Sequence, residues 1–239
     1  GNDLYLARES NPKGFFENAL INGINESILE KYDFVNRNKE FPLFDKKHSP
    51  FQPTYGQRWL TYIQQGVTIK NFDKEVKEKI IRVISLENFA FKDPRFNYTL
   101  KVWNKYLNEE VIFLCIIRHP EIVAESVLKD CQTADYLLDF YISKELVYQL
   151  WFNSYSHLLN NLKSIDQGRI VFIHYEQLLS GDILQLLSVK LEARLTSNLI
   201  SPDLNRSRTK DKSPKHVREL YNHLCKLANF RQKVWWNFF

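Results

Sequence analysis

Residues 111–126 read VIFLCIIRHPEIVAES, and this stretch decides the fold. The unbroken apolar run at residues 111–117 is typical of a buried strand in a parallel sheet. The run ends at Arg118, and Pro120 suits the first turn of a helix that carries Ser126. A strand end that supplies a guanidinium, followed by a hydroxyl near a helix start, predicts a pocket for an anion such as phosphate.

Two more strands are predicted from similar runs. The β-branched run at residues 169–173 (RIVFI) predicts a buried strand that leads into HYE at residues 174–176. A short strand predicted at residues 88–91 (NFAF) leads into KDPR at residues 92–95, where the proline stops pairing. Because ligands bind beyond the carboxyl ends of parallel strands, we expect the three strand ends to form one rim with a shared site.

The rest of the chain is mostly helical in pattern. Apolar residues recur at helical spacing in several segments, and we predict helices over residues 18–32, 55–65, 73–84, 121–129, 134–162 and 214–230. Polar, proline-containing segments at residues 36–53 and 201–215 predict loops. Strands that alternate with helices predict a helix-rich α/β fold with a central parallel sheet covered on both faces.

Length and composition set the class of protein. With 239 residues, 44% of them hydrophobic and 26% charged, the chain can bury a large core, and we expect one domain over residues 1–239. No apolar stretch approaches the roughly 18 residues of a membrane-spanning helix, so no membrane span is expected. Residues 1–10 lack the basic and apolar regions of a signal peptide.

Cysteines, histidines and charge indicate which partners to expect. Three widely spaced cysteines favour reduced thiols and a cytoplasmic location. The six histidines show no metal-ligand spacing, so no metal is assigned. The net charge of +5 is a mild bias that suits an anionic small molecule and does not by itself indicate nucleic acid. Oligomeric state stays open, and a homo-oligomer is possible.

Five landmarks in order resemble the sulfotransferase family, most closely its bacterial-type members. They are NPKGFFEN at residues 11–18, KDPR at residues 92–95, RHPEIVAES at residues 118–126, Trp151 within LWFNSY, and HYEQLL at residues 174–179. The KDP sequence is also similar to the tyrosylprotein sulfotransferases. The resemblance implies a P-loop-NTPase-like three-layer α/β/α fold and transfer of a sulfuryl group from 3'-phosphoadenosine 5'-phosphosulfate (PAPS) to an acceptor hydroxyl or amine.

The resemblance also implies roles for individual residues. Arg118 and Ser126 match the pair that binds the 3'-phosphate, and Tyr175 matches the residue against the adenine ring. Lys92 matches the lysine that stabilises the leaving oxygen, and Glu17 lies where the tyrosylprotein enzymes carry a catalytic glutamate, which acts as a base. The implied product is adenosine 3',5'-bisphosphate (PAP), the acceptor is a small molecule or a glycan, and no metal takes part.

Each candidate also has an ordinary structural interpretation. Arg118 can be a solvated strand end, Lys92 can form a surface ion pair with Asp93, and Glu17 can favour the positive end of the first helix. Ser126 can be a helix-surface serine, and Tyr175 a core tyrosine.

The chain departs from the family pattern at one place. The 5'-phosphosulfate loop, with its strand and helix, should precede Asn11, and only ten residues do so. Since the sequence also lacks methionine, we expect it to be the downstream part of a longer enzyme. Two alternatives stay open. One is a non-catalytic nucleotide-binding or scaffold domain derived from a sulfotransferase, and the other is a nucleotide kinase relative, which requires a lysine-bearing phosphate loop and a magnesium-binding acid.

Overall fold

The computed structural model describes residues 4–5, 14–32, 53–71, 73–86, 88–137, 140–200 and 211–231. The chain divides into two compact units. Unit 1 comprises Gly1–Glu109 and Glu125–Ser164, and unit 2 comprises Glu110–Ala124 and Ile165–Phe239. Residues 11–13 of the first landmark and most of the two predicted loops lie outside the described residues. The single domain over residues 1–239 stays a prediction.

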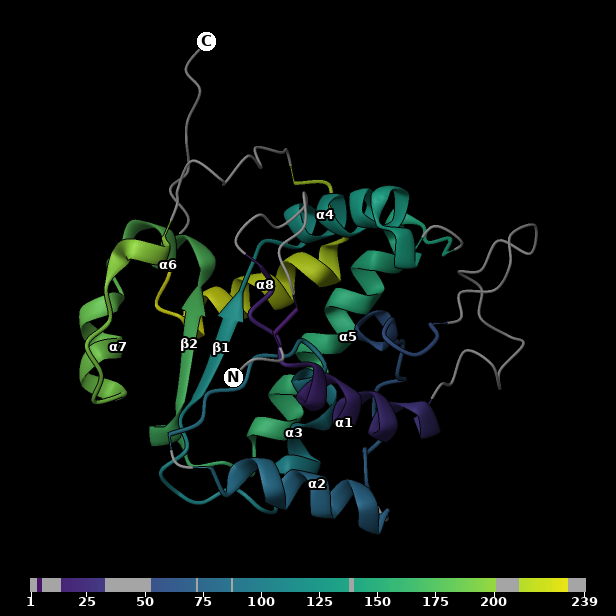
Figure 1. Ribbon diagram of the computed structural model, residues 1–239. Helices are drawn as coiled ribbons and strands as arrows, with labels where there is room; N and C mark the ends of the chain where they lie inside the picture. The colour runs from purple at the N-terminus through teal and green to yellow at the C-terminus, as the bar shows by residue number, and fades with distance from the viewer. Residues whose placement is uncertain are drawn as a thin grey trace. The chain divides into compact units, whose positions relative to one another are not determined.

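Unit 2 contains a parallel pair of strands, β1 (Phe113–Ile117) and β2 (Ile170–His174). Figure 1 shows the two strands side by side. Their register pairs the last residue of β1, Ile117, with the last residue of β2, His174. The residues that follow the strands therefore leave the sheet next to each other.

Helices follow both strands. The helix α4 (Pro120–Thr133) follows β1 and continues into unit 1, and α6 (Tyr175–Ser180) begins directly after β2. They are followed by α7 (Leu184–Lys190) and by α8 (Lys215–Leu227), which packs against β2 (Figure 1). The prediction of a helix-rich α/β fold with a parallel sheet is confirmed.

Unit 1 is helical where the structure describes it. Its helices are α1 (Ala19–Leu29), α2 (Lys74–Ile84), α3 (Phe96–Trp103), α5 (Lys144–Leu162) and the second half of α4. Short 3-10 turns occur at Glu30–Tyr32, Arg58–Leu60 and Asp135–Leu137.

Polar side chains fix the starts of three of these helices. The side chains of Asn18, Asp73 and Ser143 accept hydrogen bonds from the first backbone N–H groups of α1, α2 and α5. Each such cap contributes about 1 kcal/mol. Glu17 immediately precedes the Asn18 cap.

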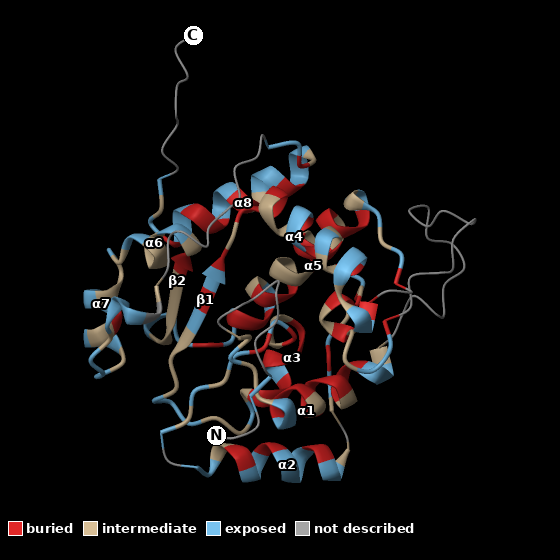
Figure 2. Ribbon diagram, turned by 45° about the horizontal axis from the view of Figure 1, so that its top comes forward, coloured by how far each residue is buried: buried red, intermediate tan, exposed pale blue. Residues whose placement is uncertain are grey.

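The core of unit 1 forms between α1, α2 and α3. Buried members include Ile21, Ile24 and Ile28 of α1, Ile80 of α2 and Trp103 of α3. Figure 2 shows buried and exposed residues alternating along α2, as expected for a helix with one face on a core. Helix α5 packs against α3.

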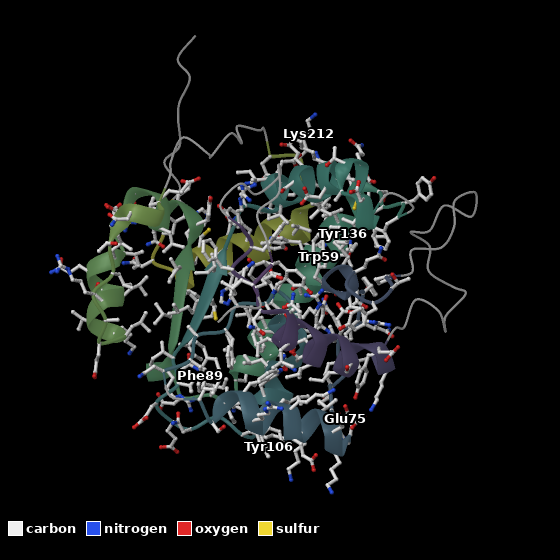
Figure 3. All side chains as sticks on the ribbon, viewed as in Figure 1. Trp59, Glu75, Phe89, Tyr106, Tyr136 and Lys212 are labelled. Carbon is white, nitrogen blue, oxygen red and sulfur yellow. The ribbon has the colours of Figure 1, made fainter. Side chains whose placement is uncertain are left out.

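Several sequence expectations are wrong. Residues 89–91 form no strand pairing in the structure, and the rings of Phe89 (labelled in Figure 3) and Phe91 stack 4.7 Å apart, with Phe91 also on Trp103. Aromatic packing within unit 1 takes the place of the expected strand pairing. The helix predicted over residues 134–162 begins only at Lys144, and residues 55–65 contain one 3-10 turn. The sequence interpretation also missed α3.

Candidate functional site

The carboxyl ends of the two strands bring Arg118 and Tyr175 together in unit 2. Because Ile117 and His174 are register partners, the next residue on each strand leaves the sheet beside the other. The guanidinium carbon of Arg118 lies 4.8 Å from the centre of the Tyr175 ring. A cation against an aromatic face is a stable arrangement, and together they offer a phosphate ligand next to a surface on which a base can stack. The resemblance assigns both residues to one nucleotide.

Each of the two strand ends also carries a histidine that caps the next helix. The Nδ1 atom of His119 accepts from Glu121 N at 3.2 Å, and Nδ1 of His174 accepts from Glu176 N at 3.2 Å. Both rings contact Tyr221 of α8, the His174 ring through a 2.9 Å hydrogen bond from Nε2 to the tyrosine hydroxyl. Since Nδ1 of His174 accepts, its single proton is on Nε2. The two histidines therefore support the backbone on which Arg118 and Tyr175 sit.

The segment that leads into α8 is tied to the start of α4. Glu121 is fully buried, and its Oε2 accepts from Lys212 N at 3.0 Å. Lys212 is labelled in Figure 3. His119 Nε2 lies 3.9 Å from Asp211 Oδ2, too far for a hydrogen bond. Burial lowers the pKa of His119, and Asp211 opposes that shift. The contacts that hold the strand ends of unit 2 therefore favour the neutral forms of His119 and His174.

We predict that acid destabilises unit 2 through His174. Burial, with a smaller contribution from His119, lowers the pKa of His174 from 6.5 to about 4. Below pH 6.5 the unfolded chain binds this proton more readily than the folded protein does. The contribution of neutral His174 to the free energy of unfolding is therefore fully present above pH 6.5 and is lost as the pH drops towards 4. The loss at pH 5 should be about 2 kcal/mol.

Urea unfolding at pH 7 and pH 5 measures this effect. The variant His174→Asn keeps a capping oxygen but removes the titrating ring, so its unfolding should depend less on pH. His223→Asn, at an exposed position of α8, is the control and should keep the wild-type dependence. An unchanged pH dependence in His174→Asn would contradict the prediction.

Lys92 and Glu17 meet in unit 1. The Lys92 ammonium donates to Glu17 Oε1 at 2.5 Å and to the backbone oxygen of Phe15 at 3.2 Å. Lys92 is 59% exposed at its side chain, whereas Glu17 is only 12% exposed. The alternative interpretation of Lys92 as a surface ion pair with Asp93 is wrong, because Asp93 is buried and binds Asn25 and Arg95. The structure thus brings together the two residues to which the resemblance assigns catalytic roles.

The backbone before Glu17 is strained in a way that creates this contact. Phe16 has a φ of 53°, in the left-handed region that a residue with a side chain rarely adopts. This conformation places the Phe15 carbonyl and the Glu17 carboxylate on the same ammonium. Such strain costs roughly 1 to 3 kcal/mol and is commonly found at functional sites.

A buried charge network holds KDPR against α1. Arg95 donates to Glu26 Oε1 at 2.6 Å and to Asp93 Oδ1 at 3.0 Å. Arg58 donates to Glu26 Oε2 at 3.0 Å, and Asn25 donates to Asp93 Oδ2 at 2.9 Å. Burial raises the pKa of Asp93, and the adjoining Arg95 opposes that rise. Two carboxylates balance two guanidiniums, so the network orders Lys92 without leaving an unpaired buried charge.

The predicted site residues therefore form two pairs. Arg118 and Tyr175 meet in unit 2, and Lys92 and Glu17 meet in unit 1. Ser126 is exposed on the part of α4 that belongs to unit 1, and its role beside Arg118 stays a prediction. The remaining landmark residue, Trp151, is buried in α5 and packs as a core residue.

Sequence reasoning missed the residues that support these pairs. Glu26 and Arg58 gave no motif, because their partners are far away in the sequence, and Asn22 gave none although its partner Glu17 is only five residues away. The repeated His cap could have been found, since a histidine stands at the end of each strand just before a helix. Within the described ranges, no group of three or more metal-ligating side chains occurs. None of the described helices combines the length and apolar character required to cross a membrane.

No protein-family model matches the sequence, and a search of curated proteins finds no significant match. Among solved structures, the chain is similar to the "Sulfotransferase Domain from the Curacin Biosynthetic Pathway". The two share 16% sequence identity, the match covers 66% of each chain, and the TM-score is 0.47. So distant a likeness carries no argument about activity, which has to be inferred from the residues and their contacts.

Proposed function

We propose that the protein is a sulfotransferase that moves a sulfuryl group from PAPS to a hydroxyl or amine of a small-molecule or glycan acceptor. One observation carries the proposal. Two residues that the resemblance assigns to one nucleotide, Arg118 and Tyr175, stand against each other at the carboxyl ends of two parallel strands. Ligands of open α/β sheets bind at such strand ends.

The nucleotide would be held by complementary chemistry. The planar guanidinium of Arg118 can donate two parallel hydrogen bonds to the 3'-phosphate, and the ring of Tyr175 can stack on adenine. Ser126 would add a neutral hydroxyl donor to the same phosphate. We also propose a cytoplasmic location, which agrees with the three cysteines being free and buried.

The second pair would carry the transfer. In an in-line displacement, the acceptor oxygen or nitrogen forms a bond to sulfur while the bond from sulfur to the bridging phosphate oxygen breaks. Glu17 would accept the acceptor's proton, and the Lys92 ammonium would stabilise the negative charge that grows on the bridging oxygen. The products are the sulfated acceptor and PAP. No metal is required by this chemistry, because the ammonium supplies the positive charge.

Calorimetric titration with PAP tests the nucleotide assignment. We expect Arg118→Ala to weaken PAP binding by about 10- to 100-fold, the effect of losing one or two charge-assisted hydrogen bonds. Arg169→Ala is a matched control, because Arg169 lies over the Phe113 ring at the opposite ends of the same two strands. That control should change PAP affinity by less than twofold.

The same titrations separate the competing functions. A preference for ATP over PAP would overturn the proposal and favour a nucleotide kinase relative. PAP binding without sulfuryl transfer to any of a panel of acceptors would favour a non-catalytic domain. Equal losses in Arg118→Ala and Arg169→Ala would contradict the assignment of the strand ends as the nucleotide site.

A further inference from the structure

Asn22 is the one buried polar residue of α1 that leaves an acceptor unsatisfied among the described residues. The helix buries Asn22, Asn25 and Glu26. Both side-chain oxygens of Glu26 accept from guanidiniums of the charge network, and Asn25 donates to Asp93 and accepts from Thr99 and Trp103. Asn22 is 4% exposed, and its Oδ1 has no hydrogen-bond partner. A buried acceptor without a partner destabilises a protein, so the presence of an amide here calls for an explanation.

The other end of the Asn22 amide supplies that explanation. Its Nδ2 donates to Glu17 Oε2 at 3.0 Å. The opposite orientation of the amide would place Oδ1 against a carboxylate oxygen, where two acceptors repel each other. Asn22 therefore donates a hydrogen bond to Glu17, and its own Oδ1 is left without a donor.

The two oxygens of Glu17 are thereby given separate partners. Oε2 is held by Asn22, and Oε1 contacts the Lys92 ammonium. Asn22 is rigid because α1 is packed into the core of unit 1 on either side of it, through Ile21 and Ile24. Because each oxygen is bonded to a different donor, the carboxylate favours one orientation, in which Oε1 faces the ammonium.

We propose that Asn22 is a positioning residue that aims Glu17 Oε1 at the reacting groups. The inference rests on the proposed function, in which Glu17 takes the acceptor's proton. Asn22 does not itself touch substrate. It fixes the carboxylate so that Oε1 points to the ammonium before the acceptor arrives, which avoids reorienting the base during the reaction.

Two nearly isosteric substitutions in the full-length protein test the proposal. Asn22→Leu fills the same space without the donor and removes the unsatisfied oxygen, so α1 should stay packed and the variant should fold, which its melting temperature checks. Asn22→Asp replaces the donor by a carboxylate that repels Glu17. We expect kcat to fall about tenfold in Asn22→Leu and further in Asn22→Asp, with KM for both substrates within twofold of wild type.

A second readout does not depend on activity. Competitive labelling with an amine reagent reports how firmly Lys92 is held, relative to the exposed Lys101 on α3. The variant Glu17→Gln gives the labelling rate of Lys92 when its partner carries no charge. In Asn22→Leu the released carboxylate should hold the ammonium less well, and labelling of Lys92 should rise at least threefold towards the Glu17→Gln rate.

The outcomes are distinct. Faster labelling of Lys92 together with reduced kcat supports the proposal. Wild-type labelling or wild-type kcat in a folded Asn22→Leu protein overturns it, because a purely structural amide would affect neither. If the wild-type protein transfers no sulfuryl group from PAPS, the proposed function fails, and an unchanged labelling rate would then also refute the positioning of Glu17.

Discussion

Replacement of Glu26 by alanine should lower the free energy of unfolding of unit 1 by about 3 to 5 kcal/mol. Glu26 is 1% exposed and accepts hydrogen bonds from two buried guanidiniums, those of Arg58 and Arg95. Alanine would leave both cations facing a cavity with only Asp93 as a buried counter-charge. Breaking a buried pair costs far more than the pair contributes, because the remaining charge stays desolvated.

Glu30→Ala is the matched control for this substitution. Glu30 also faces Arg58, at 3.6 Å, but its side chain is 69% exposed. An exposed ion pair of this kind contributes about 0.5 kcal/mol or less. Urea unfolding followed by far-ultraviolet circular dichroism measures both variants. If Glu26→Ala lowers the free energy of unfolding by less than about 1 kcal/mol, water reaches the two guanidiniums and the charge network is not desolvated.

The Glu26→Ala substitution should also disturb the position of Lys92. The segment that carries Lys92 continues into Asp93 and Arg95, and both of these bind α1. Hydrogen exchange of the α1 amides should accelerate in Glu26→Ala and stay at the wild-type rate in Glu30→Ala, because Glu26 binds Arg95 of KDPR whereas Glu30 contacts Arg58. Stability and site geometry in unit 1 therefore depend on the same four charges.

The strand-end pair could be predicted from the sequence. Two apolar runs, each followed by polar residues and a helical pattern, are sufficient to place Arg118 and Tyr175 at the ends of parallel strands. The structure adds the register, which makes these two residues neighbours. Local pattern succeeded here because both runs are short and rich in β-branched and aromatic residues, and such runs favour a strand over a buried helix.

The surroundings of Lys92 could not be predicted in the same way. The sequence favoured a strand at residues 88–91, but the ring of Phe91 packs onto Trp103 and the ring of Phe89 stacks on Phe91. The partners of Asp93 and Arg95 lie on α1, far away in the sequence. A single sequence contains no record of such distant contacts, so the pattern predicts KDPR as the end of a strand and gives no sign that Asp93 and Arg95 are buried against α1.

Substitution of Lys92 by methionine should reduce sulfuryl transfer by about 10²- to 10³-fold, or roughly 3 to 4 kcal/mol in the barrier. Methionine keeps the length of the side chain and removes its charge. Because the ammonium would act on an oxygen that becomes negative only as sulfur leaves, the loss should appear in kcat. Binding of PAP, which lacks the sulfuryl group, should change little.

Lys101→Met on α3 controls for the loss of a lysine from the same unit and should keep activity within twofold. Initial rates are measured in the full-length protein with PAPS and the best acceptor of a panel. Retention of more than a tenth of the wild-type kcat by Lys92→Met would exclude Lys92 as the group that stabilises the leaving oxygen.

The contact between Lys92 and Glu17 adds a sharper expectation to this experiment. In the protein without substrates the ammonium lies 2.5 Å from Glu17 Oε1, so each residue is the other's counter-charge. If Glu17 removes the acceptor's proton while Lys92 stabilises the leaving oxygen, both act in one transition state. The double variant Glu17→Gln/Lys92→Met should then lose clearly less than the product of the two single losses, because removing either group already disables the step. Fully multiplicative losses would indicate that the two residues act independently, and the ion pair would then be a feature of the resting protein alone.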